Sequence, residues 1–126
     1  MENFVLQETE DTPKIVFDPA NNIFEISESS HPENPIAFFK PVLGWIEEYS
    51  KNPIPLTNVA FKLDYFNSSS AKYILNIIRG FEQIQKTNPV NKVVFHWYHK
   101  EDNPDSYTAG ERYSQLTDSE FHFILF

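Results

Sequence analysis

The segment from Leu56 to Phe66 constrains the fold most, because apolar and polar side chains alternate along its length. One set consists of Val59, Phe61, Leu63 and Tyr65, and the other of Asn58, Ala60, Lys62 and Asp64. A period of two residues is typical of a β-strand with one face in the core. A strand covered on both faces would not carry charged side chains in alternation, so we expect helices mainly on one face of the sheet.

Other segments supply the remaining elements. Strands are predicted at residues 14–18, 23–29, 92–99 and 120–126, and helices at 35–49, from the serine triplet to about residue 87, and at 106–115. Pro41 should remove one backbone hydrogen bond from the first helix and cause a kink or a late start. Residues 1–12 are predicted to form a frayed polar leader.

The predicted order is β-β-α-β-α-β-α-β. Because β-α-β crossovers are right-handed, this order favours a single α/β domain over residues 13–126. We expect a mixed, mostly parallel sheet of about five strands.

The composition argues against several classes of function. The net charge of −8 argues against nucleic-acid binding, which needs clustered Lys and Arg to displace counterions. Eight acidic residues and one lysine lie in residues 1–34, so almost all of the excess charge is there. The chain has no cysteine, no long apolar run and no secretory signal pattern at its start, so we expect a cytoplasmic protein without membrane insertion.

Catalytic motifs are not found. There is no GxGxxG, no P-loop and no GxSxG, and the four histidines lack the spacing of metal ligands. We therefore predict a protein that is not an enzyme, with no catalytic residues, metal or cofactor. The alternative within this class of function is an enzyme with an unrecognised carboxylate site.

The serine triplet Ser68–Ser70 stands where the alternating strand ends and an amphipathic helix begins. Asn67 or Ser68 is suited to cap that helix, and the residues alone favour capping. The alternative is a phosphoacceptor, because a helix N-terminus favours an anion. Lys72 follows Ser68 by one turn, and Arg79 and Lys86 continue a basic stripe.

Several segments together resemble the SiaC family of bacterial regulatory phosphoproteins. They are Thr12-Pro13, Val16-Phe17-Asp18, Ser30-His31-Pro32-Glu33-Asn34, Phe38-Phe39, Pro41, Trp45, Tyr49, the string from Phe61 to Lys72 (FKLDYFNSSSAK), and Val94 to Tyr98. The resemblance covers nearly the whole chain from about residue 12.

The resemblance implies a fold similar to STAS domains and anti-sigma factor antagonists, although no helix is predicted after the last strand. It also implies three protein partners: a kinase, a PP2C-type phosphatase, and a diguanylate cyclase that binds the unmodified protein. Ser68 is the implied phosphoacceptor, where the best-known family member has Thr, and Ser69 and Ser70 are alternative acceptors. The implied partner-binding residues are Asp64, Asn67, Lys72 and Arg79. The competing hypothesis is an interaction or small-ligand-binding module in which the serines only cap the helix.

Overall fold

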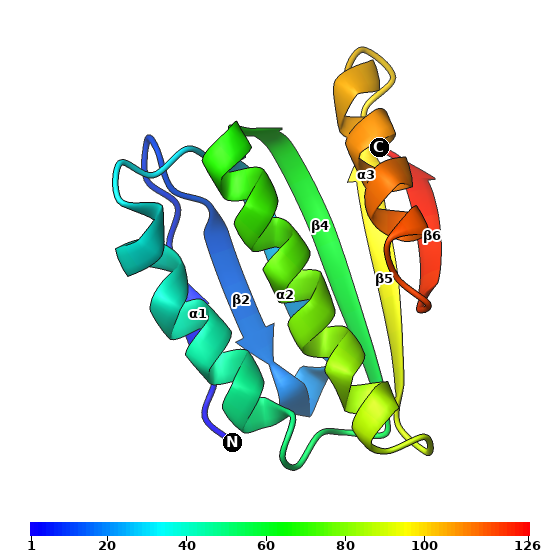
Figure 1. Ribbon diagram of the computed structural model, residues 1–126. Helices are drawn as coiled ribbons and strands as arrows, with labels where there is room; N and C mark the ends of the chain where they lie inside the picture. Colours follow the sequence, from blue (N-terminus) through cyan, green and yellow to red (C-terminus); the bar gives the residue numbers. More distant parts are fainter.

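Six strands form one sheet in the order β1-β2-β3-β4-β5-β6 in a computed structural model that describes residues 1–126 (Figure 1). The strands are β1 (Phe4–Leu6), β2 (Lys14–Asp18), β3 (Ile23–Ser30), β4 (Leu56–Phe66), β5 (Lys92–His99) and β6 (Glu120–Leu125). The helices are the 3-10 turn η1 (Pro19–Asn21), α1 (Pro35–Tyr49), α2 (Ser68–Thr87) and α3 (Pro104–Gln115). The first three strands pair antiparallel, and β3 to β6 pair parallel.

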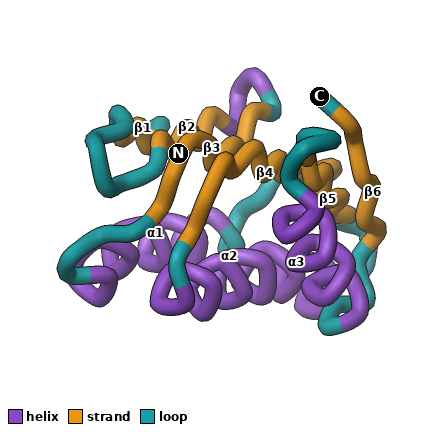
Figure 2. Tube along the Cα trace, turned by 90° about the horizontal axis from the view of Figure 1, so that it is seen from above, coloured by secondary structure: helices purple, strands orange, loops and turns teal.

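The three α-helices form one layer, and the sheet forms the other (Figure 2). The expected α/β domain, with a mixed and mostly parallel sheet and helices on one face, is therefore confirmed. None of the helices is both long and apolar enough to cross a membrane.

Aromatic side chains fill much of the core between the two layers. Phe17 on β2 and Phe24 on β3 both meet the ring of Phe81 on α2 edge-on, with centroids 5.6 and 5.7 Å apart. Trp45 and Tyr49 of α1 stack on each other and close the same cluster. Edge-on and offset pairs of this kind add to the hydrophobic effect of burial.

The N-terminal segment is more ordered than its sequence suggests. Phe4–Leu6 pairs with β2, so the expectation of a frayed leader was wrong for these three residues. Phe4 and Leu6 pack against the core while Val5 faces solvent, and Trp45 Nε1 donates a hydrogen bond to the Glu2 carbonyl. A strand of three residues, between Asn3 and Gln7, is too short to give a clear period of two.

The alternation along β4 changes near its end. The register with β3 shifts between Glu28 and Ser29, where Leu63 and Tyr65 pair with successive β3 residues and Asp64 is passed over. A bulge of this kind turns the next side chains to the opposite faces. Phe66 consequently packs against Trp97, and Tyr65 is 55% exposed, so the expected inward position of Tyr65 was wrong.

Two asparagine–proline pairs begin helices. Asn34 and Asn103 are N-caps, each followed by proline at the first helical position. The third helix therefore begins at Pro104, two residues before the predicted start. Pro41 lies within α1, which begins at Pro35 without the late start that we considered.

Gly110 on α3 gives a test of this packing. A Cβ at this position would lie 2.5 Å from Trp97 Cδ1, and the indole is held by a 2.9 Å hydrogen bond from Nε1 to the Ser106 carbonyl. We expect Gly110→Ala to lower the free energy of unfolding by about 1–3 kcal/mol, because overpacking outweighs the gain in helix propensity.

Gly44→Ala on α1 is the matched control, since nothing lies within 4 Å of the added Cβ. This change should raise the free energy of unfolding by up to about 1 kcal/mol. Urea denaturation measures both variants, and equal effects of the same sign would contradict the described packing around Trp97.

Candidate functional site

The candidate site lies where β4 ends and α2 begins, beside the end of β3. Asn67 is the N-cap of α2, and its side-chain Oδ1 accepts a 2.9 Å hydrogen bond from the Ser70 N–H. The Asn67 N–H donates to the Ser30 carbonyl at 3.1 Å, which joins the ends of the two parallel strands. Asn67, and not a serine, therefore caps the helix.

The three serines have different surroundings. Ser68 and Ser69 are exposed, and neither hydroxyl makes a hydrogen bond within the protein. Ser70 is fully buried at 0% exposure, and its Oγ lies 2.8 Å from Oγ of Ser30. Ser68 and Ser69 are therefore accessible from solvent, whereas Ser70 becomes accessible only if the start of α2 detaches from β3.

Two aromatic side chains that the sequence analysis did not select, those of His31 and Tyr65, flank the site. The ring of His31, in the loop after β3, lies 5.9 Å from that of Tyr65. Tyr65 reaches the surface because of the bulge in β4, and no pattern in a single sequence marks that bulge. The Ser30-His31-Pro32 string was part of the family resemblance and is the one sequence signal that points to this loop.

The predicted partner-binding residues do not all lie together. Lys72 is exposed one turn after Ser68, and its Nζ lies 5.9 Å from the centroid of the Tyr73 ring. Arg79 is exposed on the same helix, but eleven residues from Ser68 correspond to about 16 Å. Asp64 lies on the sheet near Lys100, whose Nζ is 3.4 Å from its carboxylate. The structure thus groups Asn67, Ser68, Ser69 and Lys72.

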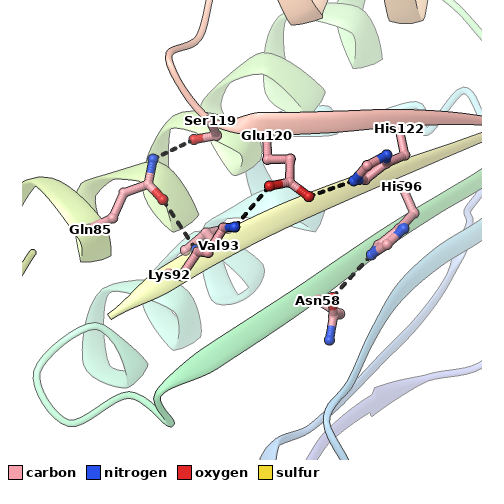
Figure 3. Close-up of polar contacts among 8 residues, drawn as sticks. All are labelled: Asn58, Gln85, Lys92, Val93, His96, Ser119, Glu120 and His122. Carbon is pink, nitrogen blue, oxygen red and sulfur yellow. Dashed lines mark hydrogen bonds and ion pairs between the residues drawn. The ribbon is translucent and has the colours of Figure 1, made fainter. Parts of the chain in front are cut away.

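A second polar cluster lies on the sheet face without helices (Figure 3). The His96 and His122 rings stack at 5.6 Å, and His122 Nε2 lies 2.6 Å from the Glu120 carboxylate, which also accepts a bond from Lys92. The Lys92 and His122 contacts lower the pKa of Glu120 to about 2. Burial, followed by the neighbouring His122, lowers the pKa of His96. No group of three or more acidic, His or Cys side chains is arranged to hold a metal ion.

The far end of α2 is held by two side chains. Glu82 is 4% exposed, and its carboxylate accepts hydrogen bonds from the Asp118 N–H at 2.7 Å and the Ser119 hydroxyl at 2.9 Å. Gln85 bonds both Ser119 and the Val93 N–H (Figure 3). These contacts connect α2 to β5 and to the start of β6, so the helix is fixed to the sheet at both ends.

The comparisons with known proteins agree with the fold. The profile described as "SiaC family regulatory phosphoprotein" matches residues 6–126. SiaC of Pseudomonas aeruginosa superposes with a TM-score of 0.88 at 21% identity over 100% of both chains. Its apo crystal structure gives 0.88 at 22% identity over 98% of this chain and 99% of that one.

A third solved structure is described as the diguanylate cyclase SiaD in complex with its activator SiaC from the same organism. It superposes with a TM-score of 0.88 at 21% identity, over 98% of this chain and 99% of that one. A search of curated protein sequences gives no match.

The profile match identifies the family, while the solved structures at these identities establish the fold. The family description is that of a regulatory protein, in agreement with the prediction of a protein that is not an enzyme. The chain belongs to the SiaC family of regulatory phosphoproteins.

Proposed function

We propose that this protein is a phosphorylation-controlled activator of a diguanylate cyclase, and thereby acts in cyclic di-GMP signalling. In the unmodified state it binds the enzyme, and phosphorylation of Ser68 releases it. A partner kinase adds the phosphate and a PP2C-type phosphatase removes it, in the cytoplasm. The solved complex of the P. aeruginosa cyclase SiaD with its activator SiaC supports the choice of partner.

The exposed, unbonded hydroxyl of Ser68 at the first position of α2 carries this proposal. Because Asn67 already caps the helix, Ser68 is not needed for capping. Its side chain is free to enter a kinase active site without loss of a structural contact.

The electrostatic surroundings suit a switch at this position. The first turn of α2 contains no acidic residue, and the helix N-terminus and Lys72 both favour an anion. A phosphate adds about −1.5 to −2 charges at a helix start that carries no acidic residue. Desolvating that charge in an interface disfavours docking, and a hundredfold loss of affinity corresponds to about 2.7 kcal/mol.

The alternative is a small-ligand module in which the triplet only caps the helix. It is less well supported, because Asn67 alone caps and the hollows of the molecule are open to solvent. An intact mass without phosphate, together with a small molecule that copurifies with the protein, would favour this alternative.

Ser68→Ala tests the acceptor. The variant should fold with an unchanged unfolding midpoint, because the hydroxyl makes no internal contact, and should take up no phosphate from the cognate kinase. Intact-mass spectrometry after incubation with kinase and ATP measures the result. Stoichiometric phosphorylation of this variant would show that another residue is the acceptor.

Ser69→Ala and Ser70→Ala are the matched controls, and both should still be phosphorylated. Ser70→Ala should also lower the free energy of unfolding by about 1–3 kcal/mol, because the buried Ser30 hydroxyl loses its partner. Loss of phosphorylation in Ser69→Ala alone would move the acceptor to that residue.

Ser68→Glu tests the switch. The added charge should weaken binding to the cyclase about tenfold or more, with a matching loss of activation, whereas Thr108→Glu on α3 should leave both unchanged. Isothermal titration calorimetry and cyclic di-GMP production measure the two effects. Full activation of the cyclase by the Ser68→Glu variant would show that charge at this position does not control cyclase binding.

A further inference from the structure

The last strand, β6, is an edge of the sheet that lacks the usual protection. It lies outermost, beyond β5 (Figure 2). Edge strands of natural proteins are commonly blunted by shortness, by Lys or Pro, or by a bulge. The opposite edge, β1, has three residues, whereas β6 has six, contains neither Lys nor Pro and pairs with β5 without a register shift. The outer side of β6 is therefore open to pairing with another strand.

The backbone groups of β6 that face this open side can be identified. The Phe126 N–H donates a 2.9 Å hydrogen bond to the His99 carbonyl at the end of β5. Each residue of a strand directs its N–H and C=O to one side, and the side alternates from one residue to the next. The even-numbered residues of β6 therefore bond to β5, and the N–H and C=O groups of Phe121, Phe123 and Leu125 point outward.

A second copy of the same strand fits this edge. In an antiparallel pair with a two-fold axis at Phe123, this residue faces its own copy, and Phe121 faces Leu125 of the second copy. Each facing pair exchanges both of its backbone hydrogen bonds. A shift of two residues in either direction leaves one of the outward-pointing residues without a partner in the strand, so the register centred on Phe123 makes the most hydrogen bonds.

Apolar side chains surround the same backbone groups. Phe121 and Phe123 are half-buried, and Leu125 is 60% exposed. The ring of Phe123 lies 5.2 Å from that of Tyr107 on α3, which is itself 39% exposed. Aromatic and apolar pairs across two strands stabilise a sheet, so pairing at this edge would gain contacts from side chains that a lone copy leaves in solvent.

The charges also suit a second copy, although the chain is acidic. Eight acidic residues lie in residues 1–34, which contain β1, β2 and β3 at the far edge, so two copies joined through β6 keep them apart. In the register centred on Phe123, Phe126 lies opposite Glu120 of the second copy. The Lys100 Nζ is 5.4 Å from the centroid of the Phe126 ring. Each copy thus places a cation beside the Glu120 carboxylate of the other.

We propose that this protein self-associates through β6, in an antiparallel pair with a two-fold axis at Phe123 that joins two sheets into one. β6 is separated from β4 by β5, so the start of α2 stays open in the pair. The self-association is therefore independent of the proposed function and can be tested without the cyclase.

Leu125→Pro tests the backbone pairing. Proline removes an outward N–H that the monomer does not use, so the fold should persist, with an unchanged unfolding midpoint at concentrations where the protein is monomeric. The wild type should shift from the 14.8 kDa monomer toward a dimer in a concentration series by sedimentation velocity. The dissociation constant of the variant should be at least about tenfold higher, because each dimer loses two backbone hydrogen bonds.

Leu125→Ala is the matched control, because it removes the same exposed side chain and keeps the N–H. Its dissociation constant should lie closer to that of the wild type than to that of Leu125→Pro.

Cross-linking tests the register. The chain has no cysteine, so His122→Cys introduces a single thiol, on an exposed residue of β6. In the proposed pair it lies diagonally across from its own copy, at about 7–8 Å. Bismaleimidoethane should therefore give a covalent dimer on a denaturing gel. Val5→Cys, 50% exposed on the opposite edge strand β1, should remain a monomer under the same conditions.

Every other result overturns the proposal. A wild type that stays monomeric at all concentrations excludes self-association, and an extended peptide that binds this monomer would assign the edge to a different partner. Equal weakening by Leu125→Pro and Leu125→Ala would show apolar contact without strand pairing. A covalent dimer of Val5→Cys without one of His122→Cys would place the contact at β1. If Leu125→Pro does not fold, the His122→Cys cross-link decides.

Discussion

The parallel pairing of β3 with β4 determines where everything else in this protein lies. Each of these strands is followed by a helix on the same face of the sheet, so α1 and α2 both begin at one edge and run in the same direction (Figures 1 and 2). The positive ends of two helices therefore meet beside the loop after β3 and the turn after β4. The hydroxyl of Ser68 lies at this edge, in the first turn of α2, which contains no acidic residue.

The position of α2 depends on hydrogen bonds of serine, glutamate and glutamine side chains. The Ser30–Ser70 pair joins β3 to the first turn of α2, and Glu82 and Gln85 join its last turns to β5 and β6. A helix held at both ends does not need Ser68 for its position. For this reason the proposed modification of Ser68 would change the charge of the surface and leave the fold as it is.

Much of the fold could be predicted because its signals are local. The alternation in β4 and the patterns of the other predicted segments identified most elements, and the family resemblance led to Ser68. The strand Phe4–Leu6 was missed because three residues carry no period, and Tyr65 was misplaced because the bulge at Asp64 depends on pairing with β3. The burial of Ser70 likewise depends on Ser30, forty residues earlier, so no local pattern separates it from Ser68.

Ion pairs on the open sheet face and unpaired cations on α2 both bear on where a partner binds. On the open sheet face, ion pairs such as Lys62–Glu25 and Lys92–Glu120 would have to be desolvated by any partner that covered them. Desolvating a pair that is already formed costs free energy and gains little in return. On α2, Lys72 and Arg79 have no acidic partner within 4 Å, so an acidic surface that approaches them forms new ion pairs without breaking old ones. These two cations of α2 therefore offer an acidic partner contacts that cost no existing ion pair.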